Sequence, residues 1–183
     1  WYLQKHIAYP LDKTINKQID NAFEFLAASA LEQPQVIVHR DFHSRNLMIS
    51  DQQNPAIIDF QDAVIGPVTY DLVSLLRDCY VEWPQNKIQE WMLGHHEHCT
   101  QTGIIKDVDK KTFLRWFDLM GAQRHLKAAG IFARLNQRDG KPGYLKDIPR
   151  TLAYVKEVAT RYPELAIIKS ILESIDLSQH KLN

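Results

Sequence analysis

The sequence predicts an α+β chain that is mostly helical and carries one small β region. Three short apolar segments lie close together at 36–39, 47–50 and 56–59 and are rich in β-branched residues. Beyond residue 70, apolar side chains recur at helical spacing almost to the end of the chain. The expected order is one helix, a compact β region with loops, and then a helical bundle.

The first helix is expected at residues 12–32. Asp12 is a candidate N-cap, because its carboxylate can accept a hydrogen bond from a backbone amide of the first turn. Apolar residues follow at helical spacing: Ile15, Ile19, Phe23, Leu26 and Ala30. The helical pattern stops at Pro34, just before the first strand segment.

The β region is expected to hold three strands, "VIVH", "LMIS" and "AIID". Turn-forming residues bound them, namely Pro34, "DQQN" at 51–54 and the pair Gly66-Pro67. We therefore expect the chain to turn at each of these positions.

Proline and glycine separate the remaining helices. "YDLVSLLRDCYVEW" at 70–83 has an apolar stripe, and Pro84 suits the first turn of the next helix. A long helix is expected to begin at Asp109 or Thr112 and to end in "RDGKPG" at 138–143. Two more helices are expected near 145–160 and 164–175.

The length and composition of the chain indicate a single globular domain. The chain has 183 residues, of which 45% are hydrophobic, and 22 basic residues balance 22 acidic residues. This balance favours neither nucleic acid nor an anionic membrane as a partner. No apolar run approaches a membrane span in length, and the first residues lack the features of a signal peptide. We interpret Cys79 and Cys99 as reduced thiols, which favours a cytoplasmic location.

The most informative segment is "VHRDFHSRNLMI" at 38–49. Phosphoryl transfer needs a carboxylate that orients the attacking hydroxyl and accepts its proton, and it needs oxygen ligands for Mg²⁺. Asp41 is the candidate base and Asn46 a candidate metal ligand, because both belong to one loop between two strands. Asp59 ends a nearby strand, from which a second carboxylate can reach the same ion.

The specificity of this pattern depends on its combination of parts. A His-Arg-Asp triplet alone is weak support for catalysis, because Asp and Asn often occupy ordinary turns. The order strand, H-R-D-x-x-x-x-N, strand, turn, strand and D-F is far more specific. We therefore interpret Asp41, Asn46 and Asp59 as one catalytic group.

The segment "HRDFHSRNLMI…AIIDFQDA" resembles the aminoglycoside phosphotransferase-like kinases, a family that includes choline kinases and shares the protein-kinase fold. The resemblance implies ATP and Mg²⁺ as cofactors. It also implies that Asp41 is the catalytic base and that Asn46 and Asp59 bind the metal.

The same resemblance implies structural support from His39, Arg40 and Asp71, the last of which lies in "GPVTYDLVSLL". As an acidic residue at a helix start, Asp71 is also favoured by the helix dipole.

The sequence departs from protein kinases in two features: Gln61 replaces the glycine of D-F-G, and only eleven residues separate Asp59 from Asp71. So short a segment leaves no room for a phosphorylatable activation loop. A small-molecule acceptor is therefore favoured, and Arg40 is expected to form a local ion pair.

The later segment "FLRWFDLMGAQRHLKAAGIFARLNQRDGKPGYLKDIPRTLAYV" resembles the bacterial anomeric kinases of N-acetylmuramate and N-acetylglucosamine, which act in peptidoglycan recycling. This resemblance implies phosphorylation of the anomeric hydroxyl of such a sugar. Two alternatives stay open: a kinase for another hydroxyl acceptor, such as an aminoglycoside, choline or homoserine, and a pseudokinase-like binding module without turnover. The basic character of 120–141 disfavours choline and aminoglycosides, which need an aromatic cage or an acidic patch.

The whole chain, residues 1–183, resembles only the carboxy-terminal lobe of such a kinase. It has no G-x-G-x-x-G loop and no "VAIK"-type lysine before residue 38, both of which belong to the amino-terminal nucleotide lobe. It also begins at Trp1 rather than at methionine, so we expect a piece of a longer protein. We expect this piece to fold, to bind ATP weakly or not at all, and to have negligible turnover alone.

The helical region is expected to bind the acceptor. Basic residues follow one another along its helical turns: Arg124, His125, Lys127, Arg134 and Arg138. Arg124 or Arg134 is a candidate for the lactyl carboxylate of N-acetylmuramate, which arginine can bind with two parallel hydrogen bonds. The alternative is a solvated basic face. His43, in the catalytic loop, is a further candidate for the acceptor site, and its alternative role is a hydrogen bond that stabilises the loop.

The histidine cluster at 94–99 and the aromatic residues of the helical region are interpreted as structural rather than functional. "GHHEHC" at 94–99 places only His95 and His98 three apart on one helix face, so a zinc site without a second ligand cluster is not favoured. The aromatic residues at helical spacing are interpreted mainly as core: Trp83, Trp91, Phe113, Trp116 and Phe117.

Overall fold

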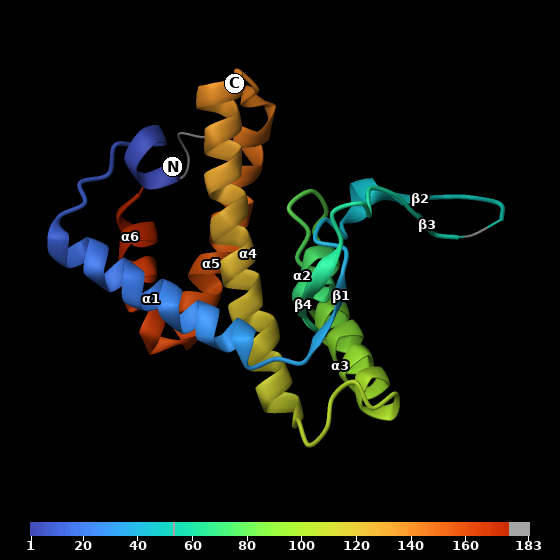
Figure 1. Cartoon of the computed structure of the whole chain (residues 1–183). Coiled ribbons are helices and arrows are strands. Elements are labelled where there is room, and N and C mark those ends of the chain that lie inside the picture. Colours follow the sequence, from blue (N-terminus) through green and yellow to red (C-terminus); the bar gives the residue numbers. More distant parts are fainter. Residues whose placement is uncertain (53, 176–183) are drawn as a thin grey trace. The chain divides into compact units, whose positions relative to one another are not determined.

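The computed structural model describes residues 1–52 and 54–175 and is mostly helical, with two small antiparallel sheets (Figure 1). The chain divides into two compact units. The loop-bearing unit is Ser29–Gly121, and the helical unit combines Trp1–Ala28 with the described residues from 122 onward. Helices α1 (Lys13–Leu31) and α4 (Lys110–Asp139) each continue from one unit into the other, and the assignment of the whole chain to one lobe stays a prediction.

The β region contains four strands rather than three. β1 (Gln35–Val38) pairs with β4 (Val64–Pro67), and β2 (Leu47–Met48) pairs with β3 (Ala56–Ile57), both antiparallel. In Figure 1, β2 and β3 form a narrow hairpin that extends from the rest of the loop-bearing unit. The three predicted strands therefore exist, the first shifted by one residue and the other two shorter than predicted, but they do not form one sheet.

The prediction of a turn at Gly66-Pro67 was wrong, because these residues end β4. Gly66 lies opposite Val36, and a Cβ added to it would meet Val38 Cγ2 at 2.8 Å. The glycine therefore allows a close approach between two strands rather than a turn. Pro67 is the last residue of its strand, where the missing amide proton is tolerated.

Helix α1 follows the predicted pattern with one exception. Asp12 caps it, since the Asp12 Oδ1 atom accepts a hydrogen bond from the Ile15 amide at 2.7 Å. Ala22 and Leu26 are buried, whereas Phe23 is 47% exposed, so its assignment to the apolar face was wrong. At this turn the small Ala22 occupies the buried position.

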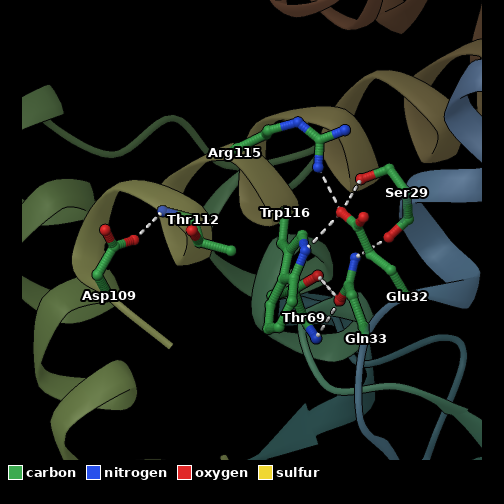
Figure 2. Close-up of polar contacts among 8 residues, drawn as sticks. All are labelled: Ser29, Glu32, Gln33, Thr69, Asp109, Thr112, Arg115 and Trp116. Atoms are coloured by element: carbon green, nitrogen blue, oxygen red, sulfur yellow. Dashed lines mark hydrogen bonds and ion pairs between the residues drawn. The ribbon is translucent and has the colours of Figure 1, made fainter. Parts of the chain in front are cut away.

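The end of α1 is fixed to the rest of the loop-bearing unit by polar contacts, which Figure 2 shows. Glu32 Oε1 accepts a hydrogen bond from Trp116 Nε1 at 2.7 Å and also binds Arg115. Gln33 Oε1 accepts hydrogen bonds from the hydroxyl and the amide of Thr69, at 2.7 and 3.3 Å. Because Gln33 and Thr69 are both buried, these bonds hold the start of β1 beside the start of the next helix.

That helix, α2 (Tyr70–Leu76), is shorter than the predicted helix at 70–83. Arg77 leaves helical geometry, with φ −119° and ψ 51°, and the Asp78 carboxylate accepts a hydrogen bond from the Tyr80 amide at 2.8 Å. The prediction beyond Leu76 was therefore wrong. The next helix, α3 (Gln85–Gln101), begins directly after Pro84, which is its N-cap rather than a member of its first turn.

The apolar core of the loop-bearing unit lies among α2, α3 and the first part of α4. Its members include Val73, Leu76, Met92, Phe113 and Phe117. The predicted aromatic core is confirmed for Phe113, Trp116 and Phe117. Trp91 differs, because it is 39% exposed and its ring meets the Trp83 ring edge-on at 5.3 Å.

A buried ion pair adds to this core. Arg77 Nη2 lies 3.0 Å from Asp118 Oδ1, and both side chains are almost inaccessible. The pair joins the end of α2 to α4. Gly121 leaves space for it, since an added Cβ would lie 3.2 Å from Arg77 Nη1. A buried pair of this kind becomes strongly destabilising if one partner is removed, because a charge is then left uncompensated.

The long helix α4 begins where the sequence indicated. Asp109 Oδ1 accepts a hydrogen bond from the Thr112 amide at 2.7 Å (Figure 2), and this bond together with the Thr112 side chain lowers the pKa of Asp109. The helix ends at Asp139 because Gly140 adopts φ +62°.

Two more helices, α5 (Ile148–Arg161) and α6 (Ala166–Ser174), pack against each other in the helical unit. They confirm the two predicted helices, with later starts, because 3₁₀ turns occupy Pro142–Asp147 and Pro163–Leu165. A π-helical turn at Tyr2–His6 precedes α1. None of the helices in the described residues is both long and apolar enough to cross a membrane.

Candidate active site

The predicted catalytic residues belong to two neighbouring turns of the loop-bearing unit. The first runs from the end of β1 through a 3₁₀ turn, Ser44–Asn46, into β2. The Asn46 amide group Nδ2 donates a hydrogen bond to the Asp41 backbone oxygen at 2.9 Å. Asn46 thus fixes the path of the chain between itself and Asp41.

The second turn follows β3 and carries Asp59. Asn46 Nδ2 lies 3.4 Å from Asp59 Oδ2, and the Ile58 amide donates to the Asn46 backbone oxygen at 3.1 Å. Gln61 Nε2 donates to the other carboxylate oxygen, Asp59 Oδ1, at 2.7 Å. A single amide side chain, that of Asn46, therefore contacts both Asp41 and Asp59 and brings the three predicted residues together.

The side-chain oxygen atoms of Asn46 and Asp59 are suitable ligands for magnesium. Asn46 uses its Nδ2 group for the contacts above and retains a carbonyl oxygen, and Asp59 supplies an exposed carboxylate. Mg²⁺ prefers oxygen ligands and often binds one or two carboxylates together with substrate phosphates. Within the described residues, no three His, Cys, Asp or Glu side chains gather into a possible metal site. Asn46 and Asp59 therefore fit a metal shared with phosphate better than a metal held by protein alone.

Asp71, in the first turn of α2, binds the backbone at the start of the loop that carries Asp41 and Asn46. Its two carboxylate oxygens accept hydrogen bonds from the amides of His39 and Arg40, at 2.6 and 3.1 Å. Arg40 has φ +78°, a conformation that non-glycine residues rarely adopt. Its Nη1 atom donates to the Asp62 backbone oxygen at 3.3 Å. These contacts hold a strained backbone immediately before Asp41.

His39 connects the two turns. Its Nε2 atom lies 2.9 Å from the Ile58 backbone oxygen, next to Asp59. The ring of His39 also meets the Phe42 ring edge-on at 5.8 Å. His39 therefore fixes the end of β1 relative to the residues that follow β3.

Asp78 supports the second half of the loop, and the sequence analysis missed it. This carboxylate is 1% exposed and accepts hydrogen bonds from the amides of Ser44 and Tyr80, both at 2.8 Å. Its position in "LLRDCY" follows a helical pattern that suggests one more turn of helix, so no local signal distinguished it. The contact becomes visible only when residues 44 and 78 are brought together in the fold.

Tyr80 contacts two side chains of the same loop. The His43 ring meets the Tyr80 ring edge-on at a centroid distance of 5.4 Å. Arg45 Cζ lies over the Tyr80 ring, 3.5 Å from its centroid. The segment from Asp78 to Tyr80 therefore contacts the residues between Asp41 and Asn46 through both backbone and side chains.

The proposed acceptor residues are distributed over both units. Arg124 and Arg134 lie on α4 in the helical unit and are half-buried, whereas the other predicted site residues belong to the loop-bearing unit. His125 is buried, with its ring 5.0 Å from the Tyr154 ring. It therefore belongs to the core of the helical unit rather than to an exposed basic face.

The histidines of α3 have structural contacts. His96 Nε2 lies 2.8 Å from the Val108 backbone oxygen, and His95 Nε2 lies 3.4 Å from Cys99 Sγ. Burial lowers the pKa of His95, and the nearby His98 lowers it further. No disulfide joins Cys79 and Cys99.

The sequence was also compared with known proteins. Residues 1–95 match a family model described as the phosphotransferase enzyme family. The chain is 45% identical over 175 residues to an N-acetylmuramate/N-acetylglucosamine kinase of Pseudomonas aeruginosa, with 96% of this chain and 52% of that protein covered. Proteins of the same name from Pseudomonas putida and Neisseria meningitidis are 43% and 42% identical, with 96% and 94% of this chain and 51% of each relative covered. The chain thus spans about half the length of the curated relatives it matches.

Proposed function

The chain belongs to the phosphotransferase enzyme family, and from that premise we propose that it is the carboxy-terminal lobe of an ATP-dependent amino-sugar kinase. The acceptor is the anomeric hydroxyl of N-acetylmuramate or N-acetylglucosamine, by analogy with the relatives. The main structural support is the contact of Asn46 with both Asp41 and Asp59. This function belongs in the cytoplasm, where ATP is available.

Each residue of the group has a chemical task in this proposal. Asp41 orients the sugar hydroxyl and accepts its proton as the oxygen attacks the γ-phosphorus of ATP, whose bond to the β,γ-bridging oxygen breaks to release ADP. Asn46 and Asp59 hold Mg²⁺, which supplies positive charge against the phosphate oxygens when bound. Asp71 and His39 keep the loop in shape through the contacts described above. The side chains of His43, Arg124 and Arg134 are proposed contacts of the sugar.

The nucleotide is bound mainly by an amino-terminal lobe that precedes this chain in the complete enzyme. Support comes from the missing glycine-rich loop and from the half-length match to the relatives. This chain alone is then expected to bind ATP weakly and to have negligible turnover.

The proposal is tested by ³¹P NMR on ATP, Mg²⁺ and N-acetylmuramate. The samples are this chain alone and a two-lobed protein in which it follows the amino-terminal half of the Pseudomonas aeruginosa relative. A sugar-1-phosphate signal is expected only from the two-lobed protein. Nucleotide binding without phosphorylation of any amino sugar would reject the proposed acceptor, and near-native turnover by this chain alone would reject its assignment as half of the catalytic unit.

The role of Asp41 is tested in the same two-lobed protein. Asp41→Ala removes the proposed base and should lower kcat at least about 100-fold. Asp62→Asn is the matched control, because it alters another exposed acid near the site and keeps the backbone oxygen that binds Arg40. If kcat of Asp41→Ala stayed within a few fold of the parent value, Asp41 would not be the base.

A further inference from the structure

Arg45 lies in the catalytic loop, between Asp41 and Asn46, and has no part in the roles assigned above. Its side chain is exposed, and Cζ lies 3.5 Å from the centroid of the Tyr80 ring. Among the described residues, no oxygen accepts a hydrogen bond from its guanidinium group. The other arginine of this loop, Arg40, donates to the Asp62 backbone oxygen. Arg45 therefore presents a positive charge whose hydrogen-bond donors are available to a ligand.

Both partners of this stack are fixed by the same buried carboxylate. Asp78 binds the Ser44 amide, directly before Arg45, and also the Tyr80 amide, at 2.8 Å in each case. Asp78 is 1% exposed, so these bonds are shielded from water. The backbone on each side of the stack is thus held in place. The Arg45 side chain then loses less conformational entropy when it binds a ligand than a freely moving surface arginine would.

The chemistry of this arrangement suits a carboxylate. A guanidinium group over an aromatic face keeps its N–H groups at its edge, where they can form two parallel bonds to the oxygens of an acid. The position is also defined relative to the proposed chemistry, because Arg45, Asp41 and Asn46 share one loop of the loop-bearing unit. Arg124 and Arg134 belong to the other unit and to no part of this loop.

We propose that Arg45 binds the carboxylate of an anionic sugar acceptor and thereby sets the preference for N-acetylmuramate over N-acetylglucosamine. This inference rests on the proposed function and goes beyond it by naming a specificity-determining residue. The two sugars in the names of the relatives differ at one substituent: N-acetylmuramate carries a lactyl ether with a carboxylate where N-acetylglucosamine has a hydroxyl group. A positively charged side chain that binds this carboxylate distinguishes the two sugars without contacting the anomeric hydroxyl that reacts.

The test compares both sugars in the two-lobed protein. The measured quantity is the ratio of kcat/KM for N-acetylmuramate to kcat/KM for N-acetylglucosamine, and KM for ATP is measured alongside. Arg45→Gln should lower this ratio about 10- to 100-fold, the size expected for loss of hydrogen bonds to a charged group. Arg45→Lys keeps the charge without the paired geometry and should lower the ratio less. Tyr80→Leu removes the stacking partner and should change the ratio in the same direction.

Arg161→Gln is the matched control, because it removes a surface arginine of α5 that pairs with Glu157 at 3.1 Å. It should leave the ratio unchanged. An equal loss for both sugars in Arg45→Gln, with or without a higher KM for ATP, would overturn the inference and assign Arg45 to the phosphates or to loop geometry. A parent protein that phosphorylates neither sugar would instead overturn the proposed function. The two failures are therefore distinguishable.

Discussion

Asp59 adopts a left-handed backbone conformation, with φ +66°, that is uncommon for non-glycine residues, and two amide side chains contact its carboxylate. Gln61 Nε2 binds one oxygen at 2.7 Å, and Asn46 Nδ2 approaches the other at 3.4 Å. Gln61 occupies the position of the glycine in the D-F-G motif of protein kinases. In this chain the residue at that position therefore has a side chain that can orient the proposed metal ligand.

Gln61→Ala in the two-lobed protein is predicted to weaken the dependence on magnesium. The variant loses one hydrogen bond to a carboxylate, so the Mg²⁺ concentration needed for half-maximal rate should rise about 10-fold. KM for the sugar should change little, because Gln61 contacts only Asp59 in the proposed site. The measurement is the initial rate as a function of Mg²⁺ concentration at saturating ATP.

Gln61→Glu is a stricter version of the same experiment, because it places a second negative charge beside Asp59 and removes the donor. It should disturb the Mg²⁺ dependence more than Gln61→Ala does. Gln52→Ala, another exposed glutamine of the same unit, provides the control. If Gln61→Ala changed KM for the sugar and left the Mg²⁺ dependence intact, Gln61 would be a sugar contact instead.

At the residue scale, the proximity of Asp41, Asn46 and Asp59 could be predicted because the motif spacing is fixed by short strands on either side. The position of Asp71 could also be predicted, because an acidic residue at the start of a helix is favoured by the helix dipole. Asp78 and Tyr80 could not be predicted, because both lie in a segment with a helical pattern and no motif marks either of them. Arg45 was not singled out either, since its stacking on Tyr80 leaves no pattern in the chain.

Among the elements, strand β4 depends on a glycine for its pairing with β1. Gly66→Ala places a methyl group 2.8 Å from Val38 Cγ2, and Val38 is buried and cannot move freely. The free energy of unfolding should fall by about 1–3 kcal/mol, as for other overpacked sites. Urea denaturation of this chain, followed by circular dichroism, measures the change.

Gly94→Ala is the opposite case and serves as the matched control. Gly94 lies inside α3, and an added Cβ would meet no atom within 4 Å. Alanine should therefore stabilise the chain by about 0.5–1 kcal/mol, because it favours the helix and restricts the unfolded state. Destabilisation by both substitutions to the same extent would show that steric contact at Val38 does not explain the effect of Gly66→Ala.

The helices were easier to predict than the strands for a physical reason. Helical periodicity repeats over many residues, so α1, α4 and α5 could be located from sequence alone. Strand β4 has four residues, and its Gly66-Pro67 pair is also typical of a turn. The shortened α2 was missed because Asp78 is held by the distant Ser44 rather than by its helical neighbours.

At the scale of the whole molecule, the β region exposes an unusual amount of apolar surface. Ile37 and Ile65 face each other across β1 and β4 and are 78% and 65% exposed. Other exposed apolar residues of the same region are Met48, Ile49, Ile57, Ile58, Phe60 and Val64. A surface of this kind is typical of an interface. We propose that the amino-terminal lobe covers it in the complete enzyme.

This chain alone is therefore predicted to self-associate and to bind the dye ANS. Replacing Ile37 and Ile65 together by lysine should reduce both effects with little loss of stability, because both side chains already face solvent. Sedimentation velocity at several protein concentrations and ANS fluorescence are the measurements. Leu31→Lys is the control, since Leu31 is 77% exposed but lies at the end of α1. A monomeric parent chain that binds no ANS would contradict the proposed interface.

The assignment to a phosphotransferase family could be predicted for the whole molecule, because one compact motif carries it. The position of the sugar could not, because its candidate contacts lie in two units and depend on how side chains meet in the fold. The two sugars named for the relatives differ by a single substituent, so one side chain is enough to distinguish them. Specificity is therefore the part of the function that sequence patterns describe least.

The support that α2 and the residues directly after it give to the loop around Asp41 also sets an order for folding. The amides of His39, Arg40 and Ser44 find their acceptors 32, 31 and 34 residues further along the chain. Closing a loop of that length costs entropy before any contact repays it. The catalytic loop should therefore become ordered late, after α2 has formed and docked. During synthesis, a ribosome that has just made Asp41 must add more than thirty residues before the loop around that aspartate can form these hydrogen bonds.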